Sequence, residues 1–147
     1  MSVPAGQRKE NRLEVVMQAR ELAVYTLRIT SNKNVFIPDY DESVKLKIQD
    51  SALTIFNNLM DANNIRVDDN VGRWQERDRL QKDAERACNT LLNLIYLAQT
   101  LYHLRASRIK YWSESVISVR GLIRKWNHSD CTRYGHLLKE SNVKDET

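Results

Sequence analysis

The stretch between Arg108 and Asn127 constrains the fold more than any other part of the chain. Its apolar residues follow one another at intervals of three, four, three, four and three, namely Ile109, Trp112, Val116, Val119, Ile123 and Trp126. This spacing is typical of a helix that buries one stripe of side chains against neighbouring helices, whereas a strand would need strict alternation. We therefore expect a helix with one face in a core.

Three earlier stretches show the same periodicity, and we expect helices over residues 11–31, 41–64 and 72–101. Asn11 can cap the first helix, and Asp41 or Ser43 can cap the second. The predicted buried faces are Val15, Ala19, Leu22, Thr26 and Ile29 on the first, Val44, Ile48, Ala52, Ile55, Leu59 and Ala62 on the second, and Leu80, Ala84, Ala87, Leu91, Leu94, Ala98 and Leu101 on the third.

Turn-forming residues are scarce, with 4 Gly and 2 Pro among 147 residues, and both prolines lie outside the periodic stretches. Because sheets need many tight reversals, this scarcity favours an all-α protein. Four amphipathic helices joined by short links predict an up-down-up-down four-helix bundle over residues 11–127. Residues 1–10 are predicted to form a flexible N-terminal arm, and residues 128–147 a C-terminal tail that contains at most one short helix.

Positive charge is concentrated in the last third of the chain. The formal net charge is +4, and residues 101–147 hold 9 basic and 5 acidic groups. Such asymmetry indicates an anionic partner, since arginine and lysine neutralise phosphates and release counterions. The candidate RNA- or DNA-binding residues are Arg105, Arg108, Lys110, Arg120, Arg124 and Lys125 on the fourth helix and Arg79, Lys82 and Arg86 on the third.

The alternative interpretation of these basic residues is an ordinary solvated helix surface. On the third helix Asp78, Asp83 and Glu85 lie among them, as expected for pairing within one helix. Three tyrosines close to the basic stretches can stack on unpaired bases if they are exposed, and these are Tyr102, Tyr111 and Tyr134.

Catalytic and metal-binding motifs are weak. The chain has no glycine-rich phosphate loop and no paired-cysteine zinc spacing. Residue types that suit zinc occur in the tail at His128, Asp130, Cys131 and His136, but one short segment would have to supply the whole site. The other candidates are loop or helix-end groups without a partner of suitable spacing, namely Asp61, Asp68, Asp69 and His103. We expect a non-enzymatic protein with no metal and no cofactor.

The two cysteines make no disulfide framework, and Cys88 lies in an apolar helical stretch that predicts a buried thiol. The first residues lack the order of a signal peptide. The longest apolar run, 91–104, is interrupted by polar residues and is too short to span a bilayer. We therefore expect a cytoplasmic protein with no membrane partner.

The order of these segments resembles a known family of small four-helix bundles. The segments that carry the resemblance lie within residues 13–127 and read ELAVYTLRIT, NKNVFIP, KIQDSALTIFNNLMDANN, LQKDAERACNTLLNLIYLAQTLYHL and VISVRGLIRKW. The family includes proteins encoded in 23S ribosomal RNA intervening sequences and the accessory variability proteins of diversity-generating retroelements. The first branch usually has an arginine-rich second helix followed by Ala-Glu-Gly, whereas this chain has Asp61-Ala62-Asn63 there. The resemblance is therefore to the retroelement branch.

This resemblance implies a non-enzymatic subunit that binds a reverse transcriptase and its template RNA during mutagenic cDNA synthesis. It also implies a bacterial or phage-encoded protein and a homo-oligomer, pentameric in that family. The competing hypothesis from the residues is a protein-binding adaptor or inhibitor, such as a small phage or mobile-element regulator. Such a protein would use an apolar patch around Ile117 or Leu122, or the linker residues Val35 and Phe36, which are also expected to fold back over the end of the core.

Overall fold

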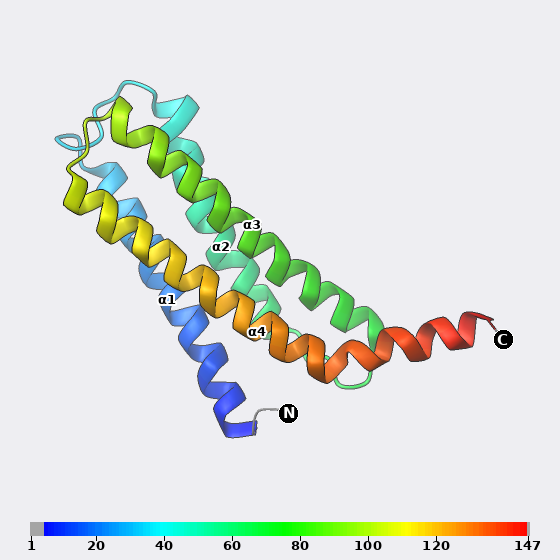
Figure 1. Ribbon diagram of the computed structural model, residues 1–147. Coiled ribbons are helices and arrows are strands. Elements are labelled where there is room, and N and C mark those ends of the chain that lie inside the picture. Colours follow the sequence, from blue (N-terminus) through cyan, green and yellow to red (C-terminus); the bar gives the residue numbers. More distant parts are fainter. Residues whose placement is uncertain (1–4, 147) are drawn as a thin grey trace.

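The computed structural model describes residues 5–146, with side chains over 12–142, and this part of the chain holds four α-helices and no strand. They are α1 (Ala5–Ser31), α2 (Leu46–Asn64), α3 (Val71–Leu101) and α4 (Ala106–Glu146), and a π-helical turn, η1 (Asp41–Lys45), directly precedes α2. Figure 1 shows the helices packed lengthwise against one another. The predicted all-α class is confirmed, and the architecture is a four-helix bundle. None of the helices within residues 5–146 has an apolar stretch long enough to cross a membrane.

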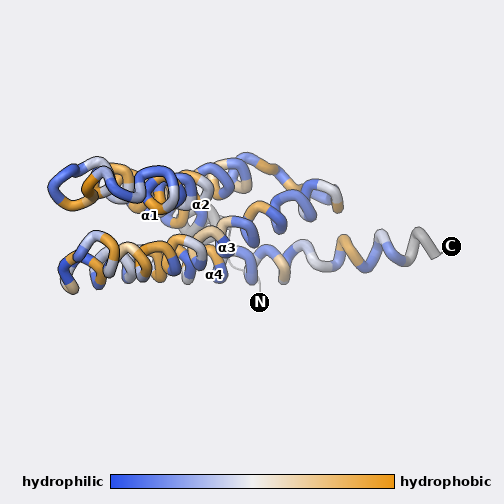
Figure 2. Tube along the Cα trace, turned by 90° about the horizontal axis from the view of Figure 1, so that it is seen from above, coloured by the Kyte–Doolittle hydropathy of each residue, from blue (hydrophilic) through white to orange (hydrophobic). Residues whose placement is uncertain are grey.

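One hydrophobic core runs through the bundle and takes side chains from all four helices. The stripe predicted for the last helix is confirmed, because Trp112, Val116, Val119, Ile123 and Trp126 are all buried. Figure 2 shows apolar and polar stretches alternating along the helices, as expected when one face of each is buried. Each fully buried aliphatic side chain contributes roughly 1.5–3 kcal/mol of transfer free energy, so these stripes are the main source of stability.

Side-chain contacts show how α4 lies against its two neighbours. Along α3, Arg120 donates to Asn89 Oδ1 at 2.9 Å and Gln81 donates to Asp130 Oδ2 at 2.7 Å, so α4 residue numbers rise as α3 numbers fall. This order means that the two helices run antiparallel. Figure 1 shows α1 on the other side of α4.

The predicted end of the last helix is wrong. Instead of stopping at Asn127, α4 continues to Glu146, and its last turns project beyond α3 in Figure 1. Buried or partly buried positions continue at helical spacing after Trp126, at Asp130, Tyr134 and Leu137. Because Asp130 and Tyr134 are polar, the apolar pattern ends at Trp126 although the buried face does not. Residues 128–146 are therefore part of the helix rather than a separate tail, and residue 147 lies outside the described residues.

The predicted start of the first helix is also wrong, because α1 begins at Ala5 rather than near Asn11. Residues 5–10 read AGQRKE and consist largely of strong helix formers, so the helix needs no apolar periodicity there. Residues 1–4 of the predicted arm lie outside the described residues.

The residue at which each helix starts depends on local hydrogen bonds and ion pairs, which the spacing of apolar residues does not indicate. Asn70 caps α3, since its side-chain oxygen accepts a 3.0 Å hydrogen bond from the Arg73 amide. No side chain caps η1, so the cap predicted at Asp41 or Ser43 is wrong. Instead Asp41 forms a 2.6 Å ion pair with Lys45, one turn later.

The linker between α1 and η1 folds over the end of the core, as predicted. Phe36 is fully buried, and its ring centroid lies 4.4 Å from that of Tyr102. The Tyr102 hydroxyl in turn donates a 3.0 Å hydrogen bond to the Asp39 carbonyl. These contacts join the linker after α1 to the end of α3, where the turn toward α4 begins.

Candidate nucleic-acid interface

The predicted basic residues of α4 that face α3 already have partners. Arg124 forms an ion pair and a hydrogen bond with Glu85, and Arg120 donates to the amide oxygen of Asn89. Both partners lie on α3, so these two arginines join helices. A phosphate that bound here would have to replace a carboxylate at Arg124.

The predicted basic residues of α3 pair with acids on their own helix. Arg79 contacts Glu76 at 2.6 Å and Asp83 at 3.0 Å, and the other pairs are Lys82–Asp78 at 3.0 Å and Arg86–Asp83 at 3.8 Å. The hydrogen bond from Arg79 lowers the pKa of the Glu76 carboxyl. These i,i+3 and i,i+4 pairs are the ordinary intrahelical pairing that the mixed charges of this stretch indicated.

Four predicted residues make no ion pair among the described residues, namely Arg105, Arg108, Lys110 and Lys125. Lys125 lies about 22 Å along α4 from Lys110, at 1.5 Å per residue. Arg105 lies in the turn from α3, directly before α4 begins at Ala106, and Arg108 and Lys110 lie in the first turns of α4.

The fold adds a fourth cation to this group, Arg28 in the last turn of α1. Arg28 and Arg108 line one hollow of about 260 Å³ together with Tyr25, Ile29, Asn32 and Val35. Arg28 makes no ion pair among the described residues either. Sequence reasoning missed Arg28, because its role depends on which α4 residues it meets. We call the group Arg28, Arg105, Arg108 and Lys110 the basic end.

Of the three tyrosines predicted to stack on bases, Tyr111 alone has a well-exposed ring, with 59% of its surface accessible. Tyr102 is buried in the core, and Tyr134 packs on Trp74 with ring centroids 5.6 Å apart. Tyr111 meets Tyr25 edge to face, with centroids 5.1 Å apart. Burial raises the pKa of Tyr25, and the nearby charge of Arg108 partly opposes this rise, so the hydroxyl stays neutral near pH 7.

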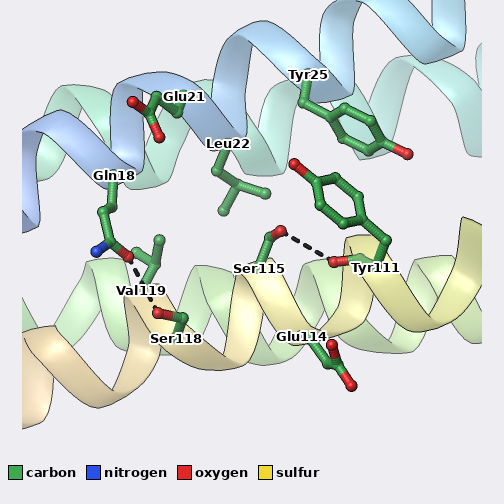
Figure 3. A pocket seen from close by; sticks show the side chains of 9 residues that line it. All are labelled: Gln18, Glu21, Leu22, Tyr25, Tyr111, Glu114, Ser115, Ser118 and Val119. Atoms are coloured by element: carbon green, nitrogen blue, oxygen red, sulfur yellow. Dashed lines mark hydrogen bonds between the residues drawn. The ribbon is translucent and has the colours of Figure 1, made fainter.

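Tyr25 also lines a second hollow between α1 and α4, likewise of about 260 Å³, which Tyr111 lines as well. Figure 3 shows Tyr25 and Tyr111 side by side at one end of this second hollow, and Gln18 reaching across to Ser118 at the other. The Ser118 hydroxyl donates to Gln18 Oε1 at 3.0 Å. Two acidic residues, Glu21 and Glu114, also line it. The groove between α1 and α4 is therefore cationic on one side of the tyrosines and anionic on the other.

The residues considered for zinc do not converge in the structure. Asp130 is buried and faces Arg77, whereas His128, Cys131 and His136 are exposed on α4. Among the described residues, no three His, Cys, Asp or Glu side chains are grouped so that they could hold a metal ion.

The other residues considered for chemistry are separated as well. Asp61, Asp68 and Asp69 are exposed, and Asp68 binds Arg66 at 3.1 Å. His103 is exposed in the turn between α3 and α4, where its φ is 53°.

The fold buries part of the apolar surface that was considered for binding a protein partner. Phe36 is buried, and Val35 and Leu122 pack against the core. Ile117 remains 47% exposed on α4. Phe36 is therefore closed to a partner in this fold, whereas Val35 is only partly buried, and the use of this linker by a protein partner stays a prediction.

Comparison of the chain with protein-family models, with curated proteins and with solved structures gives no match.

Proposed function

We propose that this chain is a non-enzymatic accessory subunit that binds RNA or DNA, built as an up-down-up-down four-helix bundle. The observation that carries the proposal is the basic end, where Arg28 and Arg108 project from two helices into one hollow without an acidic partner among the described residues. Arginine forks suit phosphate oxygens, and an unpaired guanidinium binds them without first losing a carboxylate. The exposed ring of Tyr111 beside this group supports a nucleic acid over a simple anion.

Fluorescence anisotropy with labelled RNA and DNA strands at increasing salt tests the proposal. We expect an affinity that falls steeply with salt, because each neutralised phosphate releases counterions. The double variant Arg28→Gln/Arg108→Gln should bind more weakly and reduce the magnitude of the slope of log affinity against log salt by about 0.7 for a single strand, because both arginines line one hollow that holds one phosphate.

A charge-matched control separates the basic end from net charge. The variant Arg79→Gln/Arg124→Gln removes the same two charges from residues that already pair with acids. Its affinity and salt slope should stay close to those of the unmodified chain. If the unmodified chain shows no salt-dependent binding, or if both double variants weaken it equally, the proposal fails.

From the family resemblance we also propose that the partners include a reverse transcriptase and that the chain forms a homo-oligomer, a pentamer in that family. The test of the second point is the mass of the purified protein in solution. A strict monomer at all concentrations would remove the oligomer from the proposal, and it would leave the nucleic-acid assay unaffected.

A further inference from the structure

The two hollows between α1 and α4 adjoin at Tyr25, which lines both, and we call the two together the groove. We infer that this groove binds one unpaired nucleotide of a single strand, with the phosphate in the cationic half and the base against the tyrosines. The inference rests on the proposed function and adds to it the class of nucleic acid and the part of the nucleotide that is recognised.

The cationic half suits a phosphate. Arg28 and Arg108 lie on facing helices and line the same hollow, so both can reach one anion from opposite sides. The anionic half excludes a phosphate, because Glu21 and Glu114 line it and no basic residue does. The charge distribution therefore allows only one orientation for a nucleotide in the groove.

The other half suits a planar heterocycle. Its floor includes Leu22 and Val119, which are buried, and Tyr25 and Tyr111 form its end wall with ring planes 67° apart. Figure 3 shows the Tyr111 ring standing up from α4 toward α1, where a base can stack on it. Stacking on an aromatic ring needs an unstacked base, so a single strand fits here and a regular duplex does not.

The α1 wall of this half can also read the base. Glu21 is exposed and makes no ion pair among the described residues. It precedes Arg28 by seven positions, about 10.5 Å along the helix, which is comparable with the span of a nucleotide from phosphate to base edge. An ionised carboxylate only accepts hydrogen bonds. It therefore favours guanine, whose Watson–Crick edge presents two neighbouring N–H donors.

The experiment compares labelled single strands of equal length that carry guanines, uracils or abasic sites, so that phosphates are constant and bases vary. We expect guanine strands to bind roughly 5- to 150-fold more tightly than abasic strands. Tyr111→Ala should remove this difference without changing the salt slope, and Tyr111→Phe should keep it. Glu21→Gln should reduce the preference for guanine over uracil.

Tyr96→Ala is the matched control, since Tyr96 is 79% exposed on α3 and does not line the groove. Tyr96→Ala should leave the affinity for every strand unchanged. Circular dichroism should show the same helix content for all variants. Equal binding of guanine and abasic strands, unaffected by Tyr111→Ala, would overturn the inference and leave the proposed function standing. If no strand binds, both fail. Free GMP that binds as tightly as the guanine strand would overturn the assignment to a strand.

Discussion

Arg77 on α3 and Asp130 on α4 form an ion pair in the interior of the protein, with side chains that are 2% and 1% exposed. The Arg77 Nε lies 2.9 Å from Asp130 Oδ2, and Nη2 donates a hydrogen bond to Oδ1 at 3.2 Å. The two residues are 53 positions apart, so the pair joins the first turns of α3 to the second half of α4.

The surroundings of the pair add further hydrogen bonds and an aromatic contact. Gln81 donates to Asp130 Oδ2 at 2.7 Å, Arg77 Nη1 donates to the Ile65 carbonyl at 3.3 Å, and the Arg77 Cζ lies 5.1 Å from the centroid of the Trp126 ring. Burial lowers the pKa of Arg77 and raises that of Asp130, and in each case the charge of the partner opposes the shift. Each charge is therefore tolerable inside the protein because the other is present.

Removal of one member of this pair should be costly. We expect Asp130→Ala to lower the free energy of unfolding by roughly 3–5 kcal/mol, because Arg77 would be left buried without a counter-charge. Arg77→Met/Asp130→Leu should cost less than Asp130→Ala, since it removes both charges. Urea denaturation followed by tryptophan fluorescence measures both. Asp83→Ala, which breaks exposed pairs with Arg79 and Arg86, should change stability by no more than about 1 kcal/mol. Equal losses for the two alanine variants would contradict the role assigned to burial.

The extension of α4 beyond Asn127 should contribute to stability through Leu137. Leu137 is 5% exposed and packs with Val67 and Trp74, whereas its neighbour Leu138 is 37% exposed. Leu137→Ala should therefore cost roughly 2–5 kcal/mol. Leu138→Ala removes the same atoms from a more exposed position and should cost much less. Thermal unfolding of the two variants side by side measures the difference in stability. A larger loss of stability for Leu138→Ala would mean that α4 turns Leu138, and not Leu137, toward Val67 and Trp74.

The hydrogen bond between Trp112 and Thr26 should be needed for the full stability of the core. Trp112 Nε1 donates to Thr26 Oγ1 at 3.0 Å, and both side chains are fully buried. Thr26→Val keeps the shape and leaves the indole N–H without its acceptor, so we expect a loss of about 1–3 kcal/mol in urea denaturation. Thr100→Val, at an exposed position of α3, should change stability by less than about 0.5 kcal/mol. No loss for Thr26→Val would show that water or another oxygen can replace the hydroxyl.

The buried thiol of Cys88 should make stability depend on alkaline pH. Burial raises the pKa of Cys88 from 9.0 to about 12, so the native state holds this proton more tightly than the unfolded chain does. The resulting contribution is complete below pH 9 and is lost as pH rises toward 12. Between about pH 8 and about pH 10 the unmodified chain should lose about 1.3 kcal/mol more than Cys88→Ala. If the free energy of unfolding of the two proteins falls equally between these pH values, the role assigned to the Cys88 thiol is wrong.

Local periodicity was sufficient for the helix faces because a buried stripe repeats along one element. Ile55 on α2, Leu91 on α3 and Trp112 on α4 were all assigned to the core from spacing, and all are fully buried. The same rule failed after Trp126, where the buried face continues with Asp130. A carboxylate is buried there only because Arg77 meets it from another helix, and no spacing within α4 reports that partner.

In the candidate site, too, the sequence predicted some features and the packing of the helices decided others. Spacing and charge were enough to select Arg108 and Tyr111 as candidates for binding, and also Arg124. The packing of α4 against its neighbours then distinguishes these arginines. It places Glu85 against Arg124, which is therefore paired, and it places Arg28 and Tyr25 around the same hollow as Arg108. Whether a surface charge is paired across helices depends on their register and rotation, which arise from packing of the whole core. One helix at a time, the sequence reports which face is buried; which charges stay available to a ligand is a property of the assembled bundle.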